Sequence, residues 1–436
     1  MNRAVTSGVW GRGLALACVL AGAHAARAAG AAGFVAGSES ALAAPQGGTM
    51  RVYMPSNYVA EQKWPAVFYY GGAGGSPDIA LMRTFADGRD YIVVGMPYLE
   101  EDVPSRTPQE QDAYLRRELA AFRAARAWIE GKVSVDDSRV FIGGASKGGW
   151  IASALGEMDI GRLGGMIILL AGRRQSPTAP APVGLGGKAI YVGAGEKDAN
   201  MMPARRAVEV YKRCGAVVTY EEFAGSEHEI PADAPRLRAW LAVRGRYRQS
   251  PDGQAARQEV TALANAALTA AAAEHDDLAK YDRLLDLARD PRLRFCDPAT
   301  VQRSQSEFAV LQNRSPCGEE WAAEMMFDEA VYREASIRHV ADMKNALDEY
   351  QKLVQMYPQT RYGKLAALYA PKLAEAYTKS VEATHLASAS QPGAGSTNGA
   401  HGVAPNFGGL GAGGPAYPMP VWNGNHVTFG PPPVKK

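Results

Sequence analysis

Short apolar runs alternate with amphipathic segments between about residue 50 and residue 246. Runs such as Val140-Phe141-Ile142 and Met166–Leu170 are apolar throughout, which is typical of strands buried on both faces of a parallel sheet. The pattern therefore predicts strands at Met50–Met54, Ala66–Tyr70, Tyr91–Met96, Arg139–Gly143, Gly165–Ala171, Lys188–Gly193 and Val217–Phe223.

Helical periodicity fills the intervals between these strands. The segment from Glu110 to Glu130 carries an apolar stripe at Leu115, Leu119, Phe122, Ala125 and Ile129. Pro203 suits the first turn of another helix, and a helix is also expected from Trp150 to Met158. This alternation predicts a doubly wound, mostly parallel α/β sheet with right-handed crossovers over residues 49–248.

The strand pattern then stops, and residues 249–387 are rich in Ala, Leu, Glu and Lys, which predicts an all-α C-terminal region. Residues 340–380 resemble a single tetratricopeptide-like helix pair, in which Pro358 ends the first helix. Arrays of such repeats need about three units for stability. Two interpretations stay open: a helical appendage packed on the α/β domain, and a module that binds a protein partner.

The N-terminus resembles a secretory signal peptide over residues 1–28. Arg3 and Arg12 precede the apolar run Leu14–Ala23. Ala26-Arg27-Ala28 is a small-residue cleavage site, and Ala23-His24-Ala25 is a second option. The run is too short for a transmembrane helix, so we expect a secreted or periplasmic protein without a transmembrane segment. Residues 29–48 are expected to form a flexible leader. The Gly- and Pro-rich residues 388–436 are expected to form a disordered tail.

The net charge of the chain bears on its binding partners, and its cysteines bear on disulfide and metal sites. Loss of the signal peptide removes three arginines and no acidic residue, so the formal net charge of +2 becomes −1, which gives no support for binding to nucleic acid or anionic membrane. Cys296 and Cys317 flank a loop-rich stretch and are the better disulfide pair in an oxidising compartment. The alternative is that all three cysteines, Cys214 included, are unpaired and buried. No Cys or His spacing indicates a zinc site.

The main chemical motif is Gly144-Ala145-Ser146-Lys147-Gly148, a GxSxG sequence between a predicted buried strand and a predicted helix. A nucleophilic serine needs a sharp strand-to-helix turn that exposes its Oγ, and small flanking residues let the neighbouring backbone pass close by. The sequence therefore predicts that Ser146 is the nucleophile.

A serine nucleophile needs a base, and histidine is the usual one. His228 is the only histidine between residues 25 and 274, and it follows the last predicted strand. Asp198 follows the strand Lys188–Gly193 and completes the order Ser, Asp, His, with Glu196 as a competitor for the role of acid.

The tetrahedral intermediate needs two preorganised N–H donors. One is expected from the backbone of Lys147, the residue after the nucleophile, and the other from Ala73 in the loop after the strand Ala66–Tyr70. Glycines that let the backbone approach support both segments: Gly71, Gly72, Gly74, Gly144 and Gly148.

Three segments resemble the α/β-hydrolase superfamily, in the style of its secreted esterase branch of polyhydroxybutyrate depolymerase-like, feruloyl-esterase-like and dienelactone-hydrolase-like proteins. They are the entry strand Arg51–Tyr58, the next strand Trp64–Tyr70, and the approach to the nucleophile Asp137–Val140. The resemblance implies Ser-His-Asp acyl transfer on a small-molecule or polymer-attached ester, with no metal or organic cofactor. One departure is Gly71, where the family usually has a His-Gly pair.

Two other functions fit the same residues. A secreted serine peptidase of the prolyl-oligopeptidase-like type would use the same triad, and such peptidases share the Gly-Gly loop and the GxSxGG turn. A non-catalytic envelope binding protein would instead use the helical region and the tail. The complete Ser, Asp and His set favours an enzyme over the binding protein.

Overall fold

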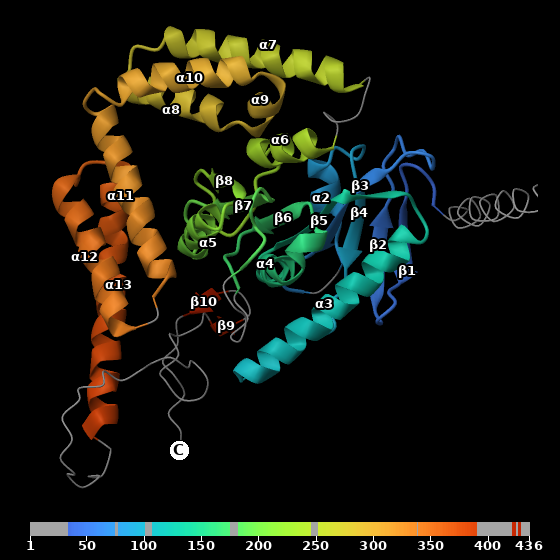
Figure 1. The fold of residues 1–436 in the computed structure, drawn as a ribbon, viewed down its shortest axis with the longest axis horizontal. Helices are drawn as coiled ribbons and strands as arrows, with labels where there is room; N and C mark the ends of the chain where they lie inside the picture. Colours follow the sequence, from blue (N-terminus) through green and yellow to red (C-terminus); the bar gives the residue numbers. More distant parts are fainter. Residues whose placement is uncertain are drawn as a thin grey trace, which may run out of the picture.

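The computed structural model describes residues 34–74, 77–100, 107–174, 182–245, 252–337, 339–389, 421–423 and 426–428. The predicted signal peptide and nearly all of the predicted tail lie outside these residues. The described chain forms an α/β unit with helices of the C-terminal region along two of its sides (Figure 1).

The α/β unit is built on an eight-stranded sheet in the order β1-β2-β4-β3-β5-β6-β7-β8. The pairs β1–β2 and β2–β4 are antiparallel, and all the other neighbours in the sheet are parallel. The strands are β1 (Glu39–Ala43), β2 (Thr49–Tyr53), β3 (Trp64–Tyr70), β4 (Ile92–Met96), β5 (Val135–Ala145), β6 (Gly165–Leu169), β7 (Ala189–Gly195) and β8 (Val217–Phe223).

These strands confirm the predicted α/β class, and all seven expected strands are present. The prediction of a flexible leader over residues 29–48 is wrong for part of this segment, because Glu39–Ala43 form the strand β1 and pair with β2. The side chains of β1 are alternately exposed and half-buried at the sheet edge. A short edge strand of this kind carries no continuous apolar run, which is why the hydrophobic pattern missed it.

Helices cover both faces of the sheet because successive side chains of a strand point to opposite sides. Phe68 of β3 joins the apolar cluster under α3, α4 and α5, whereas Val67 and Tyr69 join the cluster under α2 and α6. The helices of this unit are α2 (Ala80–Phe85), α3 (Pro108–Glu130), α4 (Lys147–Asp159), the 3₁₀ turn η1 (Ile160–Arg162), α5 (Met201–Arg213) and α6 (Pro235–Arg244).

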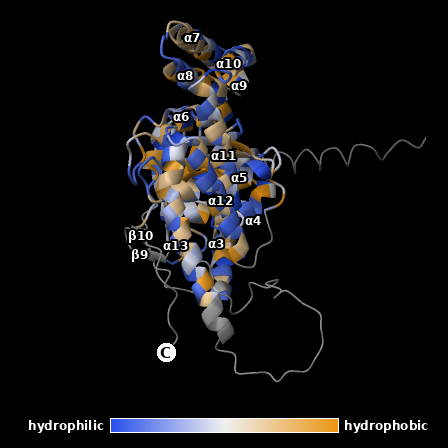
Figure 2. Ribbon diagram, turned by 90° about the vertical axis from the view of Figure 1, so that its left-hand side faces the viewer, coloured by the Kyte–Doolittle hydropathy of each residue, from blue (hydrophilic) through white to orange (hydrophobic). Residues whose placement is uncertain are grey.

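The C-terminal region is helical, as expected, and forms two groups that each contact the α/β unit. The group α7–α10 packs against α6 through Val243, and it lies at one end of the molecule in both views (Figures 1 and 2). The group α11–α13 packs against α5 through Met201 and Met202. The helices are α7 (Asp252–Ala272), α8 (Asp277–Arg289), α9 (Pro291–Cys296), α10 (Pro298–Leu311), α11 (Cys317–Ala335), α12 (Val340–Met356) and α13 (Arg361–Ala389).

Asp-Pro pairs divide the first helical group into short elements. The carboxylates of Asp290 and Asp297 accept hydrogen bonds from backbone amides of the first turns of α9 and α10. Proline occupies the first position of both helices, where its missing N–H costs nothing. Within the described residues, none of the helices combines the length and apolar content that a membrane crossing requires.

The cysteines differ from the favoured expectation. Cys214, Cys296 and Cys317 are all free thiols, and the stretch between Cys296 and Cys317 is mostly the helix α10 rather than loop. The Cys317 side chain is buried and its Sγ donates a hydrogen bond to the carbonyl oxygen of Asp277 at 3.3 Å. The predicted Cys296–Cys317 disulfide is therefore absent. The three thiols are unpaired, as in the alternative, but only Cys317 is buried, whereas Cys214 and Cys296 are half-buried.

Candidate active site

Ser146 lies on a sharp turn between β5 and α4, with φ 53° and ψ −119°. Positive φ is unfavourable for a residue with a Cβ atom, and the surrounding backbone holds it in place. The Ser146 amide donates to the carbonyl oxygen of Leu169 at 2.9 Å. Only glycine fits at Gly144, because a Cβ atom there would lie 2.3 Å from the carbonyl carbon of Gly148. The local structure is thus the strained turn that the GxSxG motif predicts.

Three parallel strands bring Ser146, Asp198 and His228 together. Ser146 follows β5, Asp198 follows β7 and His228 follows β8, and the carboxyl ends of parallel strands share one edge of the sheet. His228 Nε2 lies 2.8 Å from Ser146 Oγ, and His228 Nδ1 lies 3.0 Å from Asp198 Oδ2. The imidazole therefore bridges the hydroxyl and the carboxylate with one nitrogen each.

The Asp198 carboxylate is almost fully buried, whereas the His228 side chain is 45% exposed. The hydrogen bond from His228 to Asp198 raises the pKa of the imidazole, and the negative charge of Asp198 adds to this effect, while partial burial opposes it. Glu196, the expected competitor, instead accepts a hydrogen bond from the Gly225 amide at 2.7 Å. The structure therefore pairs His228 with Asp198.

The glycine-rich loop after β3 lies beside the serine. A Cβ atom on Gly72 would sit 3.8 Å from the Ser146 Cβ, and a Cβ atom on Gly148 would sit 2.4 Å from the Gly71 carbonyl oxygen. Ala73 and Gly74 are exposed, and Gly74 has φ 105°. Lys147 is the first residue of α4. Both segments expected to supply amide donors thus lie next to Ser146.

Two residues at this edge were not anticipated from the sequence. The Asn200 amide donates to Asp198 Oδ1 at 2.8 Å, and its side chain donates to the Leu170 carbonyl oxygen at 2.9 Å, which fixes the loop that carries Asp198. The Tyr98 hydroxyl donates to the carbonyl oxygen of Gly71. Both residues lie just beyond the carboxyl end of a strand, and that position is the signal that would have found them.

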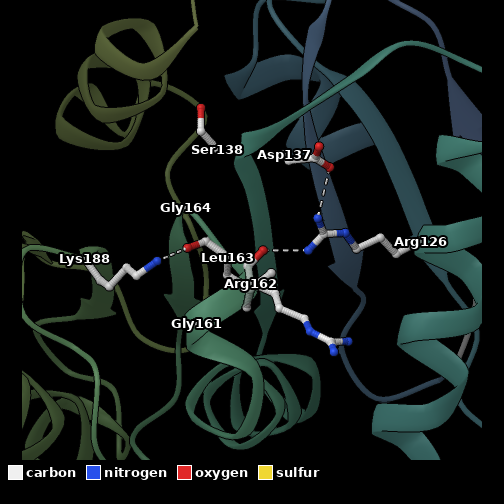
Figure 3. A pocket seen from close by; sticks show the side chains of 8 residues that line it. All are labelled: Arg126, Asp137, Ser138, Gly161, Arg162, Leu163, Gly164 and Lys188. Atoms are coloured by element: carbon white, nitrogen blue, oxygen red, sulfur yellow. Dashed lines mark hydrogen bonds and ion pairs between the residues drawn. The ribbon is translucent and has the colours of Figure 1, made fainter.

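A separate hollow of about 550 Å³ is lined by residues at or just before the starts of β5, β6 and β7, so it lies at the opposite, amino-terminal edge of the sheet. Figure 3 shows the side chains that line it. Its polar groups bond to one another: Lys188 Nζ donates to the Leu163 carbonyl oxygen at 2.6 Å, and Arg126 donates to the Arg162 carbonyl oxygen at 2.6 Å. The strands separate this hollow from Ser146.

Over the described part of the chain, His, Cys, Asp and Glu side chains form no group of three or more that could hold a metal ion.

No family model matches the chain, and no curated protein matches it in sequence. Several solved structures are similar. A phospholipase/carboxylesterase from Dyadobacter fermentans is 17% identical, with a TM-score of 0.35 over 47% of this chain and 96% of that one. A carboxylesterase from Mesorhizobium loti is 20% identical, with a TM-score of 0.36 over 44% and 94% of the two chains. A ferulic acid esterase from Anaeromyces mucronatus is 15% identical, with a TM-score of 0.36 over 45% and 86%.

The chain's own topology identifies the fold. The sheet is mostly parallel, its second strand is antiparallel to its neighbours, and helices cover both of its faces. Ser146 occupies the strand-to-helix turn at the carboxyl end of β5, with Asp198 and His228 following later strands in that order. The α/β part of this chain has the α/β-hydrolase fold.

Proposed function

We propose that this protein is a serine hydrolase that cleaves carboxylic esters by acyl transfer through Ser146. One observation carries the proposal: the His228 imidazole bridges Ser146 Oγ at 2.8 Å and the Asp198 carboxylate at 3.0 Å. A serine hydroxyl at its ordinary pKa is a weak nucleophile, and this arrangement activates it. A structural serine on a turn has no need of such a pair.

In the first half of the reaction, Ser146 Oγ attacks the ester carbonyl carbon while His228 Nε2 accepts the hydroxyl proton. Asp198 holds the imidazole in the tautomer that carries its proton on Nδ1 and stabilises the imidazolium that forms. The carbonyl oxygen becomes an oxyanion, and the backbone amides of Lys147 and Ala73 stabilise it by donating hydrogen bonds. The intermediate collapses as His228 gives its proton to the leaving alcohol, and the acyl group stays on Ser146.

In the second half, a water molecule replaces the alcohol. His228 takes a proton from this water, whose oxygen attacks the acyl carbon and forms a second tetrahedral intermediate. Collapse of that intermediate breaks the bond to Ser146 Oγ, which regains its proton from His228. The products are the acid and the free enzyme, and every proton that moves passes through one imidazole nitrogen.

The exposure of the site supports small or polymer-attached esters as the substrate class. The His228 side chain is 45% exposed, and Ala73 and Gly74 beside Ser146 are also exposed. A bulky acyl or alcohol group attached to a polymer can reach a hydroxyl that lies at the surface, whereas a narrow tunnel would exclude it.

Labelling with a fluorophosphonate probe tests the nucleophile. The wild-type protein and the Ser138→Ala control should be labelled, because Ser138 is exposed near the other end of β5. Ser146→Ala should not be labelled. If the folded wild-type protein is not labelled, or if Ser146→Ala is labelled equally, the mechanism is wrong.

A matched pair of substrates tests the bond that is cleaved. We expect p-nitrophenyl butyrate to be hydrolysed at a much higher kcat/KM than the p-nitroanilide of the same acid, and only with Ser146 present. Faster hydrolysis of peptide amides than of any ester would overturn the proposed ester preference and favour a peptidase.

We also propose that residues 1–28 direct export. The basic start, the apolar run Leu14–Ala23 and the Ala26-Arg27-Ala28 sequence support this. Expression in a bacterium with a periplasm, followed by N-terminal sequencing, should give a mature chain that begins at Ala29. Full-length protein that stays in the cytoplasm would contradict export without affecting the proposed reaction.

A further inference from the structure

The glycine-rich loop after β3 starts with Gly71, which has no side chain to hold the loop from within. In this structure a tyrosine that follows another strand contacts Gly71 instead. Tyr98 follows β4, which is the parallel neighbour of β3, and its hydroxyl donates a hydrogen bond to the Gly71 carbonyl oxygen. The support therefore comes from the next strand of the sheet rather than from the loop itself.

Tyr98 is itself held from several sides. Its side chain is nearly buried, and its ring packs on the Tyr70 ring at 5.7 Å between centroids. Lys147 Nζ lies 4.3 Å from the centroid of the Tyr98 ring, within the range of a cation–π contact. The amide of the following residue, Leu99, donates to the buried Glu118 carboxylate at 2.8 Å. The hydroxyl thus has a fixed position from which to donate.

Burial raises the pKa of the Tyr98 phenol well above its ordinary value, and nearby Tyr114, Tyr69 and Glu118 add to this. The phenol therefore stays protonated at every pH at which the enzyme would work. A protonated hydroxyl is needed here, because a carbonyl oxygen only accepts hydrogen bonds.

The contact matters because the loop is rich in glycine. Gly71, Gly72 and Gly74 have wide conformational freedom, so the loop needs a contact to select one orientation of its peptide groups. A carbonyl and the next N–H belong to one rigid plane and point in opposite directions. A hydrogen bond to the Gly71 carbonyl therefore also fixes the direction of the Gly72 amide, in the residue before Ala73. The same carbonyl oxygen packs against Gly148 of the nucleophile turn.

We propose that Tyr98 is a positioning residue that fixes the Gly71 peptide and so preorganises the loop for the oxyanion. Its ring also lies under the Lys147 side chain, so one tyrosine contacts both segments expected to supply amide donors. The inference rests on the proposed esterase reaction. Preorganised donors stabilise the transition state more than the bound substrate, so the loss of Tyr98 should appear in kcat rather than in KM.

Tyr98→Phe tests this, because it removes only the hydroxyl and keeps the ring contacts. Tyr91→Phe is the matched control: Tyr91 precedes the same strand, is buried, and donates its hydroxyl to the Leu241 carbonyl oxygen at 2.7 Å. We expect Tyr98→Phe to lower kcat on p-nitrophenyl butyrate by about 10- to 100-fold with little change in KM, less than the loss of a direct donor. Tyr91→Phe should keep kcat within about twofold, although each variant loses a buried hydrogen bond of similar stability.

A boronic acid inhibitor gives a second readout. Its adduct with Ser146 is tetrahedral and places an oxygen where the oxyanion forms, so Tyr98→Phe should weaken butylboronic acid by a factor close to the loss in kcat/KM. Equal kcat and inhibition constants for Tyr98→Phe and Tyr91→Phe, in an active wild-type background, would overturn the positioning role alone. A folded wild-type protein that neither hydrolyses the ester nor reacts with fluorophosphonate would overturn the esterase proposal and this inference with it.

Discussion

Gly148 packs against the carbonyl oxygen of Tyr70 so closely that a Cβ atom on Gly148 would lie 2.1 Å from that oxygen. Tyr70 ends β3 and Gly148 lies in the first turn of α4, so this contact joins the strand before the glycine-rich loop to the helix after Ser146. Because Gly148 has no side chain, the glycine-rich loop can lie this close to the turn that carries Ser146.

Gly148→Ala should separate these two segments. The methyl group would meet backbone atoms of Tyr70 and Gly71, which cannot rotate away as a side chain can. We expect a loss of about 1–3 kcal/mol in the free energy of unfolding and a large loss of kcat in the folded fraction. Thermal melting and ester hydrolysis measure the two effects.

Gly161→Ala is the control for that substitution, because a Cβ atom on Gly161 meets nothing within 4 Å. It should change neither the melting temperature nor kcat appreciably. Full activity in Gly148→Ala would show that the loop and the nucleophile turn do not need this spacing.

The pH dependence should report His228. Its pKa is raised by the hydrogen bond to Asp198, and only the neutral imidazole can accept the serine proton. The value of kcat/KM should therefore rise with pH through a midpoint above the ordinary histidine value of about 6.5. Because the folded-state pKa is raised, the stability that protonated His228 contributes is present below the unfolded pKa and is lost as pH rises through the folded one.

Asp198→Asn should change both the rate and the pH profile. Loss of the carboxylate removes the main cause of the raised pKa, so the midpoint of kcat/KM should move to lower pH. Loss of the correct tautomer should reduce kcat by roughly 10⁴-fold. A pH–rate series on p-nitrophenyl butyrate gives both values.

Asp137→Asn is the matched control for Asp198→Asn, since the Asp137 side chain is 72% exposed and lies at the opposite edge of the sheet. It should keep the wild-type rate and midpoint. An Asp198→Asn enzyme with an unchanged midpoint would mean that another group supports His228.

Arg205 of α5 should be important for stability rather than for chemistry. It pairs with Glu222 of β8, and its guanidinium lies 5.3 Å from the Phe327 ring and 5.6 Å from the Tyr362 ring of the C-terminal helices. Arg205→Ala leaves the Glu222 charge without this partner, and we expect a loss of about 3 kcal/mol in the free energy of unfolding. Differential scanning calorimetry measures it.

An exposed arginine provides the comparison. Arg303 pairs with Glu307 on the surface of α10 with its side chain 61% exposed, so Arg303→Ala should change the free energy of unfolding by less than about 0.5 kcal/mol. Equal effects of the two substitutions would mean that the contact between α5 and the helical region contributes little.

The three free cysteines should be open to alkylation once the protein is unfolded. Burial raises the pKa values of Cys296 and Cys317, which favours the protonated thiols in the folded protein. Iodoacetamide added after denaturation without reductant should alkylate Cys214, Cys296 and Cys317, as read by peptide mass. A disulfide-linked peptide containing Cys296 and Cys317 would contradict the structure.

Much of the α/β unit could be predicted because its signals are local. β8 has the predicted bounds Val217–Phe223, and each residue of the Ser146, Asp198 and His228 set follows a predicted strand. The parallel sheet then forces these strand ends together without any knowledge of side-chain contacts. Elimination also helped, since only one histidine was available near the end of that unit.

What the sequence did not reveal depends on contacts between distant segments. Whether β1 forms depends on pairing with β2, because its own side chains bury little. The bond between Tyr98 and Gly71 depends on β4 lying beside β3, an order that apolar runs do not encode. Cysteine spacing likewise carried no information about α10, which occupies the stretch between Cys296 and Cys317.

The helix α5 begins three residues after Asp198, and its first two side chains, Met201 and Met202, belong to the apolar cluster of α11–α13. For protein engineering, this means that the α/β unit cannot be expressed alone without exposing part of its apolar interface. A fusion or truncation that ends near residue 249 would expose these methionines and loosen the segment that follows Asp198. The shortest truncated form of this protein that keeps the segment after Asp198 in place must therefore include α11, α12 and α13.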